Sequence, residues 1–230
     1  MTRNTEDARR RDQVLGQVRR SLGVRGDEAA RKAIVRGRLE NHPRGTIPKR
    51  GQPGLFQQVR KFIAMAEAAD ATTKRVKTKA EVLAVVTEFL RRKKLPAKLV
   101  HGADPYINSL DWRASNAPDA RRGRAEPDDE VSLAKAFGGV AETGTLVMLS
   151  GPENPVTLNF LPFTEIVLIE AKDILGNYEG VWDRLREDKG VGIMPRTVNW
   201  ITGPSRSADI GQELLLGAHG PGDLHIIIVG

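Results

Sequence analysis

The sequence predicts an α/β fold in which helices alternate with the strands of a largely parallel central sheet. Short apolar runs bounded by glycine or proline occur at residues 131–137, 146–149 and 166–169. Near-continuous apolar runs of this kind are typical of strands buried on both faces. Segments with helical spacing of apolar residues lie between the expected strands, and such alternation favours a parallel sheet.

The first part of the chain has a different character. Residues 5–22 and roughly 27–39 have narrow apolar stripes among many arginines, and we expect two helices there. A connector with three prolines and three glycines follows at residues 42–54. We therefore predict a helical arm at 1–41, a connector at 42–54 and an α/β domain at 55–230, with the arm separable from the domain.

Within the domain, Thr78 and Glu81 have the spacing of a capping box, in which each side chain accepts from a free backbone N–H group at a helix start. The polar segment 102–129 has room for a short strand and a helix. The expected order is a helix from 55, a strand at 72–76, the capped helix, a strand at 98–100, the polar segment, the three apolar strands with a short helix within 154–161, a helix at 173–185, and strands at 198–201 and 224–229.

The composition excludes several kinds of site. The chain of 230 residues has no cysteine, which rules out disulfides, thiol catalysis and cysteine-ligated clusters or zinc on this chain. The four histidines lack metal-ligand spacing, so a metal site is not expected, although a carboxylate-bound magnesium ion stays open. No apolar run approaches the ~20 residues of a membrane span, and the charged N-terminus has no signal-peptide core. We expect a cytoplasmic protein.

The net charge of +7 conceals an asymmetry along the chain. Residues 1–125 carry a net charge of +16 and residues 126–230 carry −9. A basic half suits nucleic acid or another anionic partner. The basic residues nevertheless lie on expected amphipathic helices without interleaved aromatic residues, which favours a solvated basic face and argues against nucleic acid.

Two loops have unusual chemistry. After the expected strand at 198–201, Gly203 and Pro204 break the chain before a run of hydroxyl, arginine and aspartate side chains. A loop with free N–H groups and a nearby cation suits an anion, although a simple helix cap with a surface arginine is the alternative. The segment 141–145 places Glu142 beside two threonines and a glycine, where Glu142 is either a base or nucleophile or a structural acceptor.

We expect both loops at the carboxyl ends of parallel strands, where ligands of open α/β sheets bind. His219, in a glycine-rich turn, either reaches the same cleft or only stabilises its turn. The residues predicted to bind the anion are Thr143, Gly144, Thr145, Gly203, Pro204, Ser205, Arg206, Ser207, Asp209 and His219.

Three motifs closely resemble the LUD domain family, in its lactate utilisation protein C group. They are AETGTL at 141–146, GPENP at 151–155 and TGPSRSADIGQELLLGAHGP at 202–221, and the resemblance covers about residues 41–230. Ser207 replaces a threonine that is more usual in the family and keeps its hydroxyl. Gly211 stands where the family often has an acidic residue, which removes one polar contact.

The resemblance implies a Rossmann-like fold of the NagB/RpiA/CoA-transferase type. It also implies action with two iron–sulfur proteins in the oxidation of L-lactate to pyruvate, with no cofactor on this chain and the iron–sulfur clusters on the partner chains. The chain would contribute a pocket for a small anionic ligand, an assembly surface, or both. The alternative is a free-standing enzyme acting on a CoA ester or a sugar phosphate, with Glu142 as nucleophile or base by analogy with CoA transferases.

Overall fold

The chain divides into two compact units. The computed structural model describes residues 3–52, 54–190, 192–207 and 215–230, and its two units are Met1–Thr46 and Ile47–Gly230. The first unit contains the expected pair of helices, α1 (Arg3–Ser21) and α2 (Ala29–Asn41). The division between the units falls inside the predicted connector, so the residues after Thr46 belong to the α/β unit.

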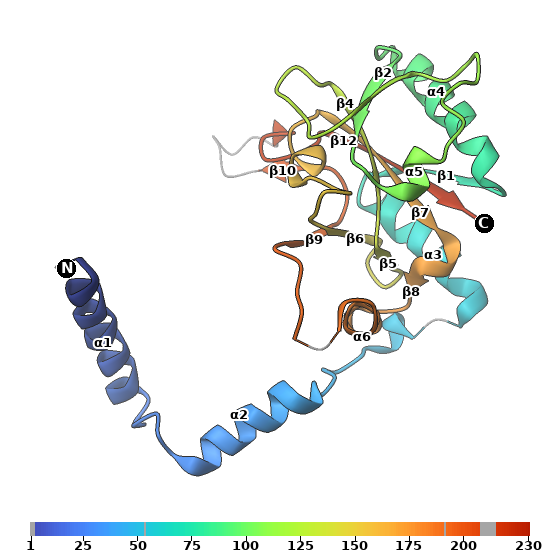
Figure 1. The fold of residues 1–230 in the computed structure, drawn as a ribbon. Coiled ribbons are helices and arrows are strands. Elements are labelled where there is room, and N and C mark those ends of the chain that lie inside the picture. The colour runs from blue at the N-terminus through green and yellow to red at the C-terminus, as the bar shows by residue number, and fades with distance from the viewer. Residues whose placement is uncertain (1–2, 53, 191, 208–214) are drawn as a thin grey trace. The chain divides into compact units, whose positions relative to one another are not determined.

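The second unit begins with the 3₁₀ turn η1 and the helix α3, and strands and helices then alternate (Figure 1). Its elements are η1 (Lys49–Gly51), α3 (Leu55–Ala68), β1 (Thr72–Val76), η2 (Lys79–Glu81), α4 (Val82–Lys93), β2 (Lys98–His101), α5 (Pro105–Asn108), β3 (Asp119–Arg122), β4 (Val131–Lys135), β5 (Gly138–Val140), β6 (Thr145–Leu149), η3 (Val156–Asn159), β7 (Thr164–Glu170), η4 (Ala171–Asp173), β8 (Ile174–Leu175), α6 (Tyr178–Lys189), β9 (Val198–Ile201), β10 (Arg206–Ser207), β11 (Leu215–Leu216) and β12 (Asp223–Val229).

A six-stranded sheet forms the centre of this unit. Its strand order is β1-β12-β7-β4-β2-β3, and every neighbouring pair is parallel. The predicted α/β class and parallel central sheet are therefore confirmed. The long central strands β7 and β12 pair over seven residues, from Thr164 with Asp223 to Glu170 with Val229.

A second, four-stranded sheet differs from the prediction. Its order is β8-β5-β6-β9, and β6 is antiparallel to both of its neighbours. The apolar runs at 146–149 and 198–201 therefore do not join the parallel sheet. The four residues 141–144 connect β5 to β6, and so short a connection allows only antiparallel pairing.

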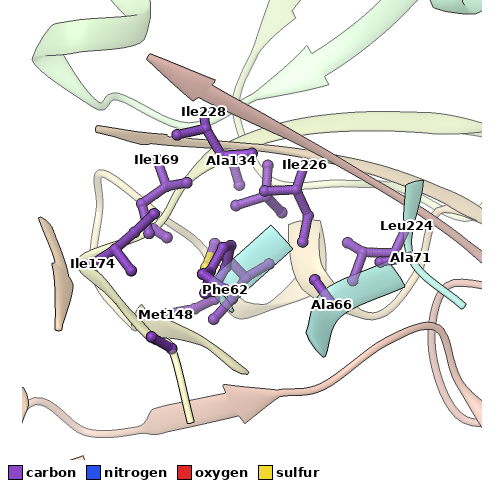
Figure 2. Close-up of a cluster of buried hydrophobic side chains, with 14 residues drawn as sticks. Phe62, Ala66, Ala71, Ala134, Met148, Ile169, Ile174, Leu224, Ile226 and Ile228 are labelled. Atoms are coloured by element: carbon purple, nitrogen blue, oxygen red, sulfur yellow. The ribbon is translucent and has the colours of Figure 1, made fainter. Parts of the chain in front are cut away.

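Two apolar cores lie on opposite faces of the central sheet. Alternate residues of β7 face opposite sides, so that Val167 and Ile169 join one core while Ile166 and Leu168 join the other. The first core contains Phe62 of α3 and Met148 of the second sheet (Figure 2). The second core contains the buried face of α4. The second sheet thus covers the same face of the central sheet as α3.

Several local predictions can be checked. The Thr78–Glu81 capping box is present, and the polar segment contains α5 and β3. The predicted helix at 173–185 is wrong at its start, because Ile174 pairs with Gly139 as part of β8 and α6 begins only at Tyr178. Asn177 caps that helix by accepting a hydrogen bond from the Gly180 N–H at 3.0 Å.

Candidate functional site

The two predicted loops lie next to each other but not where we expected them. The turn at 141–144 joins β5 to β6, and the segment from Gly203 follows β9. Both strands that border these loops, β6 and β9, belong to the second sheet. The expectation that the loops leave the carboxyl ends of parallel strands is therefore wrong. They meet because Leu146 pairs with Ile201, which sets the two segments side by side.

The threonines of the first loop bind other hydroxyls. The Thr145 Oγ1 atom lies 2.6 Å from Thr143 Oγ1 and 2.7 Å from Thr202 Oγ1. The Tyr178 hydroxyl lies 2.9 Å from Thr143 Oγ1 and 3.1 Å from Thr145 Oγ1. The side chain of Thr145 is fully buried. This hydroxyl cluster links β6, the residue that follows β9, and the start of α6.

Glu142 is covered by the segment that opens the second unit. Its side chain is only 7% exposed, and its Oε1 atom accepts from Arg50 Nε at 2.9 Å. A Cβ atom added at Gly51 would lie 2.7 Å from Glu142 Oε2, so η1 lies directly over the carboxylate. Asn177 Nδ2 donates to the Gly51 carbonyl at 2.8 Å. Glu142 and Asn177 together anchor η1 on the domain.

We expect Glu142→Gln to lower the stability of the protein and to leave any catalytic turnover unchanged. The amide keeps an acceptor for Arg50 but loses the charge, and hydrogen bonds to charged groups are the stronger ones. The free energy of unfolding should fall by about 0.5–1.5 kcal/mol, since Arg50 is mostly exposed. Denaturant titration measures this loss, and Arg50→Ala should match it. A 100-fold loss of turnover without loss of stability would instead identify a catalytic Glu142.

Arg206 is directed away from the loops that it was expected to serve. Its Nη1 atom donates to Asp70 Oδ2 at 2.5 Å, and its Nη2 atom donates to the Ala69 carbonyl at 3.3 Å. Ser207, its neighbour in β10, is buried. Asp209 and Gly211 lie outside the described residues. Arg206 therefore fastens its loop to the end of α3.

Four of the predicted residues do line one cavity. Gly203, Pro204, Ser205 and His219 border a cavity of about 220 Å³, together with Gly220 and Pro221. Ser205 organises this cavity wall, because its N–H donates to the Pro221 carbonyl at 2.7 Å and its Oγ accepts from the His219 N–H at 3.3 Å. The cavity lies beside the amino ends of β7 and β12, since its lining includes Glu165 and Leu224.

Glu165 is the functional candidate that sequence reasoning missed. It is fully buried on the face of β7 that carries Val167 and Ile169, and it lines the cavity. Asn154 Nδ2 donates to Asn159 Oδ1 at 3.1 Å, and Asn159 Nδ2 donates to Glu165 Oε1 at 2.6 Å. Among the described residues, Glu165 Oε2 has no hydrogen-bond partner. The sequence signal was an acidic residue directly before the apolar run 166–169.

The environment of Glu165 determines its protonation. Burial raises the pKa of its carboxyl to about 8, and the hydrogen bond from Asn159 opposes that rise only in part. At neutral pH the group is therefore mainly a carboxylic acid. Its Oε1 accepts from Asn159, so its O–H group is available as a donor at Oε2.

A larger, polar cavity lies at the carboxyl edge of the central sheet. It measures about 610 Å³ and its lining includes Lys135, Arg184 and the loop 150–154. These cations already have carboxylate partners, because Lys135 Nζ lies 3.5 Å from Glu170 and Arg184 Nη2 lies 2.9 Å from Asp173. An anion would compete with these ion pairs for the same cations.

Two further searches concern metals and membranes. Within the described ranges, we find no cluster of three or more histidine and acidic side chains placed to hold a metal ion. In the same part of the chain, no helix combines the length and the apolar character that crossing a membrane requires.

Comparison with known proteins identifies the family. The LUD domain matches residues 59–229. Lactate utilization protein C of Bacillus subtilis strain 168 is 30% identical over 128 residues, which are 52% of this chain and 53% of that protein. Lactate utilization protein C of Geobacillus sp. strain WCH70 is 35% identical over 116 residues, or 48% of each chain. This chain thus matches about half the length of these curated relatives.

A solved structure supports the fold. The crystal structure of a DUF162 family protein from Deinococcus radiodurans aligns with a TM-score of 0.57, covering 78% of this chain and all of that chain at 20% identity. The LUD match extends from α3 to the last residue of β12 and so includes both sheets, the hydroxyl cluster and the Glu165 cavity. The chain belongs to the LUD domain family.

Proposed function

We propose that this chain acts in the cytoplasm as the component of a lactate-oxidising system that carries no cluster, while two iron–sulfur proteins carry the clusters. The observation that supports this role is the LUD match over residues 59–229, together with relatives named for lactate utilisation. The chain has no cysteine, so thiolate ligands for a cluster must come from other chains.

The dimensions of the cavity favour a small ligand. A volume of about 220 Å³ corresponds to about seven water molecules at their liquid volume of ~30 Å³ each. A molecule of the size of lactate or pyruvate fits such a space. The covering of Glu142 by η1 counts against the alternative in which it attacks a CoA ester.

The basic arm supports an additional role in assembly. Val14, Val18 and Leu22 of the first unit are each 47–66% exposed, and arginines surround them in the sequence. Apolar side chains on an exposed, basic helix suit the surface of an acidic partner. The arm would in this way bring the domain to an iron–sulfur partner.

Reconstitution tests the proposed role. We expect L-lactate-dependent reduction of an electron acceptor when this chain and both iron–sulfur proteins are mixed, and at least tenfold less when this chain is left out. A shortened chain that begins at Ile47 keeps the whole second unit. It should restore the rate only at higher concentration, since it lacks the arm. An unchanged rate without this chain would contradict the proposal.

A further inference from the structure

A buried carboxyl group beside the small cavity has one oxygen without a partner. Glu165 lines the cavity and has no exposed surface, and its Oε1 atom is occupied by Asn159 Nδ2. Its Oε2 atom has no hydrogen-bond partner among the described residues. An unpaired polar atom in the interior is costly, and its presence beside a cavity indicates a bound group that satisfies it.

The supports of Glu165 fix its orientation. Asn159 ends η3, which Ser132 of β4 holds by donating its hydroxyl to the Leu158 carbonyl at 2.7 Å. Asn154 orients the Asn159 amide from the other side, because its Nδ2 donates to Asn159 Oδ1 at 3.1 Å. With both amides fixed in this way, Asn159 presents its NH₂ group to Glu165 Oε1. The carboxyl O–H is thereby assigned to Oε2, the oxygen without a partner.

We propose that this cavity binds a small monocarboxylate and that Glu165, as the neutral acid, donates its O–H to the carboxylate of the ligand. This inference deepens the proposed function and rests on it for the identity of the acid, as lactate or pyruvate. Hydrogen bonds from an O–H group to an ionised oxygen are short and about twice as strong as neutral ones. Ser205 provides a second hydroxyl in the lining, which also includes the apolar residues Trp200 and Leu224.

The size and charge of the cavity limit the ligand class. Room for about seven waters admits a monocarboxylate of three or four carbons. Among the described residues, the titratable side chains of the lining are those of Glu165 and His219. A dicarboxylate or a phosphate ester would bring a second negative charge into a space whose described lining has one acid and no arginine or lysine. The cavity therefore selects one negative charge on a short apolar body.

Calorimetric titration of the full isolated chain with L-lactate, pyruvate and propionate tests this inference without the partner proteins. We expect saturable binding at pH 7.5 that weakens about 20-fold by pH 9.5, because a carboxyl with a pKa of about 8 loses its proton over that range. Glu165→Gln keeps an N–H donor, so its affinity at pH 7.5 should stay within a few-fold and should not fall with pH. Glu165→Leu should lose at least tenfold at pH 7.5.

His219→Gln is the matched control, because it removes the other titratable group of the lining. The loss of affinity above pH 7.5 should persist in this variant. Absence of saturable binding by all three probes, or the same pH dependence in Glu165→Gln as in the unmodified chain, would overturn the inference. Binding of propionate with no lactate oxidation in the reconstituted system would instead leave the acid site standing and refute the proposed function.

Discussion

Gly203→Ala is expected to destabilise the domain by more than about 3 kcal/mol. Gly203 has a φ of +69°, and an added Cβ atom would lie 2.0 Å from the Ala69 carbonyl oxygen. That oxygen belongs to the backbone at the end of α3, so no side chain can rotate away. Gly144 is under the same constraint. Its φ is +70°, and an added Cβ atom would lie 2.3 Å from the Ala66 nitrogen. Both loops therefore require direct contact with the backbone of α3.

Two other glycines separate the cost of a left-handed backbone from the cost of the steric clash. Gly192 has a φ of +80° but no atom within 4 Å of an added Cβ, so Gly192→Ala should cost only about 1 kcal/mol for the left-handed backbone. Gly151 has open space and no positive φ, so Gly151→Ala should be near neutral. Denaturant unfolding measures these three variants and Gly144→Ala. If Gly203→Ala lost no more unfolding free energy than Gly192→Ala, the close approach of Gly203 to the Ala69 carbonyl would be refuted.

The parallel sheet could be predicted because its central strands carry runs that are apolar on both faces. Residues 166–169 are all fully buried, which requires a continuous apolar run, and such a run is visible in a sequence. The apolar runs at 146–149 and 198–201 also predicted strands, but not that these strands form a second sheet. Its strand β5 is Gly138, Gly139 and Val140, and short apolar runs do not reveal whether their neighbours run parallel or antiparallel. The start of α6 was missed because strand pairing by Ile174 prevails over its helical spacing.

The candidate site could be predicted only at residues of types that are typical of turns. These residue types identified Gly203, Pro204, Ser205 and His219, which do line one cavity. The partners of Glu142 and Arg206 lie 92 and 136 residues away in the sequence, and local patterns do not encode such pairs. Glu165 lies directly before the predicted strand 166–169 and was not singled out, since its chemistry depends on which face of β7 meets the cavity.

Glu165→Gln is expected to stabilise the protein progressively as the pH rises. Burial raises the pKa of Glu165 to about 8, whereas the unfolded chain has the ordinary value of 4.5. The native state therefore keeps a proton that the unfolded chain releases, and the stability that this acid contributes below pH 4.5 is lost as the pH approaches 8. Glutamine mimics the neutral acid at every pH. The variant should gain roughly 3–5 kcal/mol over the unmodified chain by pH 8.5, and only about 0.8 kcal/mol at pH 5.

Melting curves of the two chains between pH 5 and pH 8.5 measure this difference, which should reach about 10 °C at the upper end. The contributions of the other titratable groups to the pH dependence cancel, because both chains contain these groups. They include His225, whose pKa burial lowers to about 4.

Glu170→Gln, at the other end of β7, is the matched control. Burial favours a higher pKa for Glu170, but Lys172 and Lys135 hold it below the ordinary value. Glu170 is then ionised in both states above pH 6.5, so its variant should show a constant difference there. A difference for Glu165→Gln that is equally flat would mean that Glu165 is ionised in the native protein and has no proton to donate to a ligand.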